Sequence, residues 1–551
     1  MDVRSPRPGK AAKLSDTGPE SKPSIRPSAV EPIGWQPELD ELAERKAIAR
    51  AMGGAERVER QHAGGRLTVR ERIDRLLDKG SFTETGSIAG KASYGPDGRM
   101  IDFMPANCVL GRGRIDGRPV VLAGDDFTVR GGSADASIRE KYQMGEHMAA
   151  EFRIPLIRLI EGSGGGGSVK TIETRGHANL PGGVGKSSGL HLVAMNMGRI
   201  PVVALGLGSV AGLGAARLAG SHYSLMIKET SAVFVAGPPV VDRIGEKRTK
   251  QELGGYKVQL AAGTIDDAVD TEDEAFEKTR RFLSYLPSSV WDLPPRTTPD
   301  DDPNRREESL FTAVPRSRRR AYQMRRIIEA VVDRGSFFEL SRYYGRAIIT
   351  GFARLEGWPV ALMAGDPLHT AGAWGADTSQ KIMRFVDLAE TFHLPVVHLV
   401  DCHGFAVGLV AESTGTMRQA VRALAAIHQS TVPWCSILVR NVFGVGGGAH
   451  QPHTHYALRY AWPSANWGSL PLEGGVEAAY RAEIDAAPDP AAKLAEIEAR
   501  LEAMRSPFRT AEAFGIEEII DPRDTRPLLC EFANLAAPLR TPGLASFTMR
   551  G

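Results

Sequence analysis

The stretch GRGRIDGRPV, Gly111 to Val120, decides how this chain is organised, because it returns 240 positions later as GFARLEGWPV, Gly351 to Val360. The segment RIPLIRLIEGSG, Arg153 to Gly164, is repeated at the same spacing as HLPVVHLVDCHG, His393 to Gly404. Chance does not keep such matches in one order at a constant spacing. The sequence therefore contains an internal duplication, which predicts two related structural units.

The duplication divides the 551-residue chain into two predicted domains, residues 36–295 and 319–551. Between them the segment PPRTTPDDDPNRREES, Pro294 to Ser309, is rich in proline and charge, which predicts a linker over residues 296–318. Residues 1–35 are rich in Pro, Ser, Lys and Arg without apolar periodicity, which predicts a disordered tail.

Short apolar strands alternate with helical stretches in each half, for example SIREKYQMGEHMAAEF (137–152) and TSQKIMRFVDLAETFH (378–393). This alternation predicts an α/β fold with glycine-rich turns after the strands. In such sheets, ligands bind at the loops beyond the carboxyl ends of the strands. The glycine run within EGSGGGGSVK, Glu161 to Lys170, occupies a position of that kind.

Composition excludes several classes of protein. Apolar residues make up 42% and charged residues 24% of the chain, with a net charge of +2, which is typical of a soluble globular protein and argues against a broad nucleic-acid surface. The chain contains no run of about 18 apolar residues, so we expect no membrane span. The four cysteines are far apart, without zinc-type spacing, so we expect reduced thiols and a cytoplasmic protein.

Three glycine clusters follow apolar strands: SGGGGS (163–168), GSVAGLGAA (208–216) and GVGGGAH (444–450). Turns without side chains can direct backbone N–H groups at a ligand oxygen. Two such donors form an oxyanion hole, in which one donor contributes about 2.7–4 kcal/mol to the transition state. A single cluster is explained as well by a tight turn against a helix, but three clusters after comparable strands favour oxyanion binding.

Three further motifs have weaker functional interpretations. GGVGKSSG, Gly182 to Gly189, contains the GKS of a phosphate-binding loop, but that motif requires glycine where Leu180 stands. HQPHTH, His450 to His455, has no carboxylate or cysteine nearby, so a pocket lining or a surface loop is favoured over a metal site. Cys402 and His403 are adjacent on a strand end, where they point to opposite faces, which disfavours a catalytic thiol.

Several motifs together resemble the carboxyltransferase β subunits of biotin-dependent acyl-CoA carboxylases, which include propionyl-CoA and methylcrotonyl-CoA carboxylase. The resemblance covers about residues 36–540. It is carried by RLTVRERIDRLLDKGSF (66–82), DDFTVRGGS (125–133), GSVAGLGAA (208–216), QELGG (251–255), YAWPSA (460–465) and EEIIDPRDTR (517–526). It implies tandem crotonase-like (ClpP/crotonase) domains, each a curved β-sheet flanked by helices. It also implies a hexamer of β subunits, with acyl-CoA held by the N domain and biotin by the C domain.

The activity implied by the resemblance is transfer of CO2 from carboxybiotin to the α-carbon, or the vinylogous γ-carbon, of an acyl-CoA. In that mechanism backbone amides stabilise the enolates of biotin and thioester, so no side-chain base is required. Motif matching assigns the thioester oxygen to Gly164, Gly165 and Gly166, the biotin ureido oxygen to Gly448 and Ala449, and the acyl-CoA cleft to Gly212, Gly214 and Ala215.

Departures from the family pattern concern the substrate pocket. The family's Asp-x-Pro-Gly-Phe is DCHGF here, which places Cys402, His403, Gly404 and Phe405 among the implied substrate-binding residues. The aromatic residue and aspartate of the family's Gly-Gly-Ala-Tyr-Asp are His450 and Gln451. Where the family has Ser-Gly-Gly-Ala, this chain has further glycines instead of the alanine. The segment that follows QELGG lacks the histidine that is usual in the family. We therefore expect a different acyl chain, which the sequence does not name.

The chain has no Met-Lys-Met biotinylation site and no ATP-grasp glycine loop, so we expect biotin on a partner, a biotin carboxylase and carrier α subunit. We expect no metal, nucleic-acid or membrane partner. A biotin-dependent acyl-CoA decarboxylase subunit is the alternative enzyme, and a non-catalytic structural paralogue in a carboxylase complex is the alternative from another class. A crotonase-fold hydratase is disfavoured, because no carboxylate pair is evident at the glycine loops.

Overall fold

The computed structural model describes residues 34–163, 172–173, 176–178, 189–318 and 320–546. The predicted tail therefore lies almost wholly outside the described residues, and so do Gly164, Gly165 and Gly166. The N half begins with α1 (Gln36–Arg50), α2 (Ala55–Ala63) and α3 (Val69–Leu76), and its remaining helices are α4 (Arg139–Phe152), α6 (Leu190–Asn196), α7 (Leu213–Ala219), α8 (Pro238–Val241), α9 (Lys250–Gly254), α10 (Tyr256–Ala261) and α11 (Glu272–Ser284).

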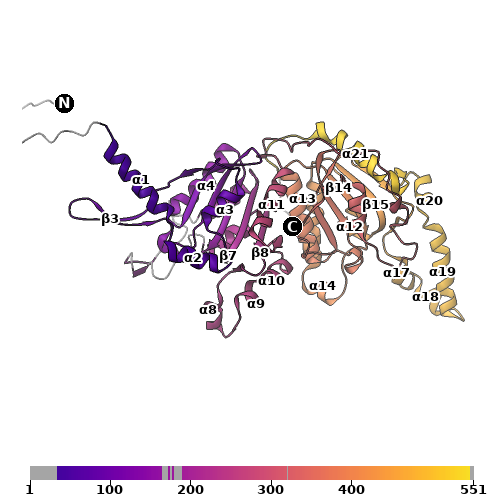
Figure 1. The fold of residues 1–551 in the computed structure, drawn as a ribbon. Coiled ribbons are helices and arrows are strands. Elements are labelled where there is room, and N and C mark those ends of the chain that lie inside the picture. Colours follow the sequence, from indigo (N-terminus) through magenta and orange to yellow (C-terminus); the bar gives the residue numbers. More distant parts are fainter. Residues whose placement is uncertain (1–33, 164–171, 174–175, 179–188, 319, 547–551) are drawn as a thin grey trace, which may run out of the picture.

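The strands of the N half are β1 (Thr83–Thr85), β4 (Cys108–Ile115), β5 (Arg118–Asp125), β6 (Leu156–Gly162), β7 (Val202–Ala211), β8 (Tyr223–Ile227), β9 (Ala232–Phe234) and β10 (Asp267–Val269). A separate ribbon pairs β2 (Gly90–Tyr94) with β3 (Met100–Pro105). The ribbon and α1 extend from one end of the molecule (Figure 1).

The C half has strands β11 (Phe338–Leu340), β12 (Ile348–Leu355), β13 (Trp358–Gly365), β14 (Val396–Cys402), β15 (Trp434–Phe443), β16 (Leu458–Ala461), β17 (Asn466–Gly468) and β18 (Glu518–Ile519). Its helices are α12 (Met324–Val331), α13 (Ala376–Thr391), α14 (Leu409–Ser413), α15 (Thr416–Gln429), α16 (Gly444–Gly448), α17 (Leu472–Ala479), α18 (Arg481–Asp485), α19 (Pro490–Met504), α20 (Pro507–Glu512) and α21 (Thr525–Ala536).

The two sheets have the same topology. The N-half order is β1-β4-β5-β6-β7-β8-β10 with β9 on β7, and the C-half order is β11-β12-β13-β14-β15-β16-β18 with β17 on β15. In each sheet the first three strands of this order are antiparallel and the rest are parallel. The predicted duplicated α/β fold is confirmed, and Figure 1 shows the two halves side by side.

The central strands explain the parallel part of each sheet. Every residue of β6 (LIRLIEG) and β14 (VVHLVDC) is buried, as expected for strands covered by helices on both faces. Arg158 and Glu161 are nevertheless within β6, and His398 and Asp401 hold the same places in β14. A buried polar side chain requires a hydrogen-bonding partner, so these positions mark where specific contacts must occur.

The repeated GRGRIDGRPV segment forms the β4–β5 hairpin, and its copy forms the β12–β13 hairpin. Both turns, Asp116–Gly117 and Glu356–Gly357, have positive φ angles at their two residues, which matches the twist of a tight hairpin. The carboxylate of Asp78 accepts both turn amides of the first hairpin, at 3.0 and 2.8 Å. Asp333 accepts both turn amides of the second, also at 3.0 and 2.8 Å. We name this contact the hairpin brace.

A single apolar core cluster extends through both halves. At the junction Tyr223 of β8 stacks on Phe282 of α11, with ring centroids 4.9 Å apart, and meets Phe338 of β11 edge-on at 5.5 Å. Arg384 of α13 forms an ion pair with buried Asp266 next to β10. The two sheets are thus packed into one body. No helix within the described part of the chain is long and apolar enough to cross a membrane.

Candidate active site

The loop after β14 and the start of α16 meet at the carboxyl edge of the C-half sheet. Gly404 has a φ of 95°, and its carbonyl accepts the N–H of Trp374 at 2.9 Å. Phe405 pairs with Trp374 as an isolated bridge. A Cβ built on Gly446 would lie 3.1 Å from the Phe405 ring. The structure therefore brings the predicted Gly404–Phe405 segment against the glycine cluster that follows β15.

The turn from β15 into α16 supplies backbone donors at this edge. Gly444 has a φ of 59°, which reverses the chain directly after the strand. The amides of the first helical turn, at Val445 and Gly446, have no acceptor within the helix. Gly447 holds the turn close to the strand, because a Cβ there would lie 2.5 Å from the Val442 carbonyl carbon. Val445 and Gly446 therefore carry N–H groups that the helix itself does not use.

The predicted donors Gly448 and Ala449 lie at the other end of α16. The Ala449 N–H donates to the carbonyls of Val445 at 3.2 Å and Gly446 at 3.3 Å. Its amide is therefore engaged within the chain in this structure, and its assignment to a ligand oxygen stays a prediction. A Cβ built on Gly448 would meet nothing within 4 Å, so this position does not require glycine for space.

The N half has the same turn from β7 into α7. Gly212, with a φ of 58°, corresponds to Gly444, and its N–H donates to the Phe234 carbonyl at 3.3 Å. The Gly214 N–H donates to the Ser163 carbonyl at 3.0 Å. Ala215 is partly buried against the cluster that contains Ile160. The start of α7 is thereby tied to the residue immediately before the predicted donors Gly164 to Gly166.

A left-handed turn supports each strand end from the preceding loop. Residues Arg130–Gly132 have φ values of 56, 62 and 65°, and Thr370–Gly372 have values of 45, 51 and 75°. A Cβ on Gly132 would lie 2.8 Å from the carbonyl oxygen of Glu161, and one on Gly372 would lie 2.3 Å from that of Asp401. Only glycine permits this close approach, so the turn fixes where β6 and β14 end.

In the N half the carboxylate at the strand end is held by arginines. Glu161 is fully buried and accepts from Arg66 at 2.7 Å, Arg72 at 2.6 Å and Gln61 at 2.9 Å. Arg72, itself 1% exposed, also forms an ion pair with Glu272 at 2.7 Å. These five residues form the Glu161 network. It positions the chain immediately before the glycine run.

In the C half the corresponding carboxylate has neutral partners. Asp401 accepts from the Tyr322 hydroxyl at 2.8 Å and from the backbone and side-chain N–H groups of Asn441 at 3.1 and 2.9 Å. Burial raises the pKa of Asp401 to about 6, although the hydrogen bonds from Tyr322 and Asn441 oppose that rise. Burial likewise raises the pKa of Asp125 in the N half to about 6.

Cys402 and His403 do not form a nucleophile pair. The Cys402 thiol is buried, lies 3.7 Å from the Gly404 carbonyl, and has a pKa raised by burial to about 12. A thiol with so high a pKa is protonated at neutral pH, which disfavours a role as nucleophile. The His403 ring instead meets Phe443 edge-on at 5.4 Å.

His450 and Gln451 follow the end of α16. The carbonyl of His450 accepts hydrogen bonds from Trp434 and Ser436, near the start of β15, and from His398 of β14. The His450 ring bonds the Gly447 carbonyl at 2.8 Å, and burial lowers its pKa to about 4, so it is neutral. Among the described residues, His450 Nε2 and Gln451 Oε1 are buried without a hydrogen-bonding partner.

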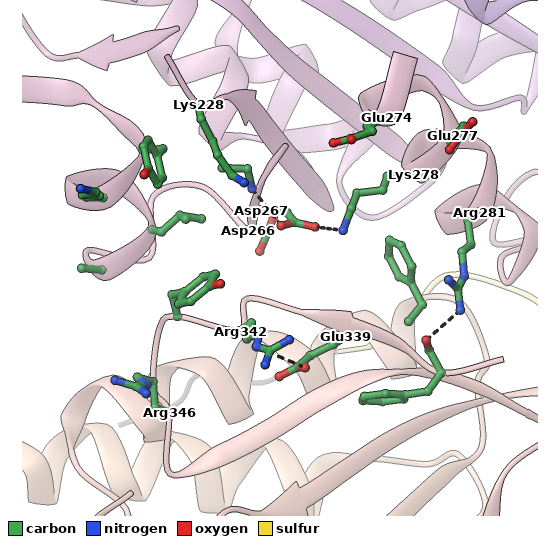
Figure 2. Close-up of a pocket in the computed structure, with 18 residues that line it drawn as sticks. Lys228, Asp266, Asp267, Glu274, Glu277, Lys278, Arg281, Glu339, Arg342 and Arg346 are labelled. Atoms are coloured by element: carbon green, nitrogen blue, oxygen red, sulfur yellow. Dashed lines mark hydrogen bonds and ion pairs between the residues drawn. The ribbon is translucent and has the colours of Figure 1, made fainter. Parts of the chain in front are cut away.

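A cavity of about 820 Å³ is lined by residues of both halves (Figure 2). Its charged side chains include Lys278, which pairs with Asp267, and Arg281, which donates to the Gly335 and Phe337 carbonyls. Lys228 pairs with Asp270 at 2.9 Å. The contacts of Arg281 join the N half to the C half, so the cavity is best explained as part of the junction.

Family comparison agrees with the geometry of the turns. The model of the carboxyl transferase domain matches residues 60–541. The chain belongs to the carboxyl transferase family. It is 35% identical over 496 residues to the propionyl-CoA carboxylase beta chain of Cereibacter sphaeroides, covering 89% of this chain and 94% of that protein. It is 30% identical over 511 residues to the methylmalonyl-CoA decarboxylase subunit alpha of Veillonella parvula, covering 92% and 97%.

A solved structure extends the comparison to the fold. The transcarboxylase 12S hexamer, determined with methylmalonyl-CoA and methylmalonic acid bound, superposes with a TM-score of 0.81 at 30% identity, covering 94% of this chain and 98% of that one. The predicted tandem crotonase-like fold is confirmed. This carboxyl transferase is of the kind found in biotin-dependent acyl-CoA carboxylases, as the sequence predicts.

The sequence assigns the biotin oxygen to Gly448 and Ala449, and the fold adds Val445 and Gly446, at the start of α16, as candidate donors. The signal that locates them is the pattern strand-Gly-x-Gly, which is AGLG at residues 211–214 and FGVG at residues 443–446. In both halves the first glycine of this pattern has a positive φ and directly follows the longest strand. Matching the second half to the first, rather than to the family motif alone, identifies Val445 and Gly446.

Proposed function

We propose that this carboxyl transferase moves CO2 from carboxybiotin, carried by a partner chain, to the α-carbon of a short acyl-CoA. The observation that carries the proposal is the pair of equivalent strand-to-helix turns, one in each half. The reaction develops negative charge on two oxygens, one on the thioester and one on the ureido ring. Two similar edges, each with backbone donors, match that requirement.

The residues of the C-half edge suit an uncharged ring whose oxygen gains negative charge. Val445 and Gly446 would hold that oxygen with their amides, while Gly447 keeps the turn against the strand. Bound carboxybiotin would supply the CO2 and the nitrogen that takes the α-proton. In the N half, Gly164 to Gly166 follow the strand end fixed by Glu161 and would hold the thioester oxygen. Backbone donors need no reorganisation during the reaction, which is their advantage over mobile side chains.

The resemblance to propionyl-CoA carboxylase beta chains supports a short acyl chain and a biotin carboxylase and carrier α subunit as partner. The likeness to transcarboxylase 12S supports a hexamer. The Veillonella parvula relative supports the reverse reaction as the second candidate, a biotin-dependent decarboxylation. A non-catalytic paralogue is the third, but donors retained in both halves argue against it.

The test uses the complex captured from source cells on immobilised avidin, with Val445→Pro as the variant. Proline is accepted in the first turn of a helix, so it removes one donor while the fold is kept. We expect a loss of about 100-fold or more in ATP-dependent fixation of labelled bicarbonate on short acyl-CoAs, with unchanged assembly. Gly448→Ala is the matched control and should keep full turnover. Full turnover in Val445→Pro would contradict the assignment.

The same preparation distinguishes the direction of the reaction. ATP-dependent label fixation on one thioester supports the carboxylase. Loss of label from a carboxylated thioester without ATP supports the decarboxylase. Capture on avidin with neither activity supports the structural paralogue.

A further inference from the structure

A second cavity, of about 720 Å³, lies within the C half. It is enclosed by the linker segment 310–318, by the end of β15, by the loop between β16 and β17, and by the junction of α19 and α20. Figure 1 shows α19 and α20 at the end of the C half that is remote from the N half. No turn donor and no described residue of the predicted site lines this cavity. Its volume is typical of cavities that hold small organic molecules.

The charge of the lining is strongly one-sided. Four arginines face a single carboxylate: Arg316, Arg318, Arg440 and Arg505 against Glu502. Apolar side chains supply much of the remaining wall, including buried Leu310 and Trp462. An apolar wall with a few polar groups is the usual composition of a ligand site, and here the excess of arginine favours an anion.

Arg440 forms part of the wall itself. It is 4% exposed, and its guanidinium donates to the Arg320 carbonyl at 2.8 Å and to the Ser317 carbonyl at 3.1 Å. These two hydrogen bonds hold the linker segment against β15. The cavity is therefore bounded by a linker that the chain fixes in place.

The other arginines differ in how far acidic side chains neutralise them. Arg318 and Arg505 share the carboxylate of Glu502, at 2.5 and 3.6 Å. Arg316 is exposed, and no ion pair or side-chain hydrogen bond involves it within residues 34–163, 189–318 and 320–546. Arg316 is thus the guanidinium available to a ligand.

The amide of Asn466 is a second feature that indicates a ligand. Asn466 begins β17, is 5% exposed and lines the cavity. Among the described residues, its Oδ1 is buried without a hydrogen-bonding partner. A buried amide oxygen without a partner costs free energy and requires an explanation. A ligand that donates an N–H or O–H group to this oxygen would supply the missing bond.

Comparison of the two halves shows that the fold does not require this amide. Asn466 pairs with Asn441 in the β15–β17 ladder, and the equivalent pair in the β7–β9 ladder is Ala232 with Ser209. Ala232 is 2% exposed, so an apolar methyl group occupies the place of the amide in the N half. A polar group kept without a partner where the fold accepts alanine is typical of a binding site.

We infer that this cavity binds a small carboxylic acid, with Arg316 holding the carboxylate and Asn466 accepting from a hydroxyl or amine of the same ligand. A carboxylate carries one charge, which matches the one arginine that the chain leaves unengaged, and it accepts two N–H bonds from a guanidinium. The apolar wall at Trp462 packs against the body of the ligand. The site is separate from both strand-to-helix turns, so the inference goes beyond the proposed function and does not rest on it.

The test measures binding of three probes to the assembled protein by ligand-observed NMR titration. The probe 4-hydroxybenzoate has the carboxylate and the hydroxyl, benzoate lacks the hydroxyl, and 4-hydroxybenzamide lacks the charge. Wild type should bind 4-hydroxybenzoate at least about 5-fold more tightly than either of the other two, because each of them loses one polar contact.

The variant Arg316→Gln tests the carboxylate contact. It should weaken 4-hydroxybenzoate at least about 10-fold and leave 4-hydroxybenzamide unchanged. Arg316 is exposed, so the substitution leaves the core intact. Arg334→Gln is the matched control, because Arg334 is an arginine of the C half that is 71% exposed and lies outside the cavity.

The variant Asn466→Ala tests the amide contact. It introduces the residue that the N half has at the equivalent place, so we expect the fold to be kept. The variant should bind benzoate as wild type does and should lose the preference for 4-hydroxybenzoate over benzoate, since the acceptor of the hydroxyl is removed.

Four results would overturn the inference. The first is no binding of 4-hydroxybenzoate to wild type at about 10 mM. The second is equal affinity of wild type for 4-hydroxybenzoate and 4-hydroxybenzamide, and the third is unchanged affinity for 4-hydroxybenzoate in Arg316→Gln. The fourth is loss of label fixation in the complex that carries Arg316→Gln, because it would place this arginine in the reaction and not in a separate site.

Discussion

The ends of β6 and β14 occupy equivalent places in two sheets of the same topology, but they are held by different chemistry. Glu161 is surrounded by Arg66 and Arg72, whereas Asp401 accepts from Tyr322 and Asn441. Fold and strand position were kept after the duplication, and the polar contacts that fix each strand end were replaced. Equivalent position therefore does not imply equivalent energetics.

The difference in polar contacts between the two halves also involves the neighbouring helices. Arg72 of α3 corresponds to Ile327 of α12, a buried residue of the C-half core. Where the Glu161 network has an arginine, the other half has apolar packing at the equivalent position. A buried ion pair is strongly destabilising when one partner is lost, whereas neutral hydrogen bonds contribute about 0.5–1.5 kcal/mol each. The two strand ends should respond very differently to loss of charge.

The largest expected effect is that of Glu161→Gln. It leaves Arg66 and Arg72 without their shared anion in a buried place, so we expect the free energy of unfolding to fall by about 3–5 kcal/mol. Urea denaturation measures it. The matched change Asp401→Asn should cause no loss at pH 7. An equal loss in both variants would refute the contrast between the two strand ends.

The pH dependence of Asp401→Asn sharpens the comparison. The folded pKa of Asp401, about 6, lies above its usual value of 3.8, so ionisation opposes folding. This cost is absent below about pH 4, grows as the pH rises to 6, and is constant above that value. The stability of Asp401→Asn relative to wild type should therefore increase between pH 4 and 6, by at most about 3 kcal/mol, and then remain flat.

Thermal unfolding of both proteins at pH 4.0, 5.0, 6.0 and 7.5 measures this difference. Asp125→Asn provides the N-half counterpart, because burial raises the pKa of Asp125 to the same value. A difference that shrinks as the pH rises would show that the sign is wrong.

The smallest effect compares neighbouring glycines of α16. Gly447→Ala places a methyl group 2.5 Å from the Val442 carbonyl carbon and should cost about 1–3 kcal/mol, with reduced turnover because the turn donors move. Gly448→Ala has open space and should resemble wild type in melting temperature and activity. If Gly448→Ala alone lost activity at unchanged stability, the donors would lie at the end of α16 and not at its start.

Much of the fold was predictable because it depends on local pattern. The duplication, the alternation of strands and helices and the glycine turns are visible in the sequence at fixed spacing. The contacts of Gly404 and Phe405 with the start of α16 follow from two neighbouring parallel strands, whose carboxyl ends meet at one edge.

The rest depends on contacts that no short segment contains. The exact donors do not follow from the sequence, because GVGGGAH offers several glycine pairs and the position of Gly444 at the strand end is visible only in the fold. Arg72 meets Glu161 across 89 residues, so neither segment by itself shows the pair. The Glu161 network joins residues even further apart.

The hairpin brace has a consequence for the order in which the chain assembles. Asp78 reaches its turn across 38 residues, and each hairpin joins two strands that follow each other directly. Arg72 meets Glu272 across 200 residues. Because closing a short loop costs less entropy than closing a long one, we expect both braced hairpins to form early and the Glu161 network late. A nascent chain whose α11 has not yet emerged from the ribosome would contain the first hairpin but would lack Glu272, so Arg72 would have only one of its two carboxylate partners.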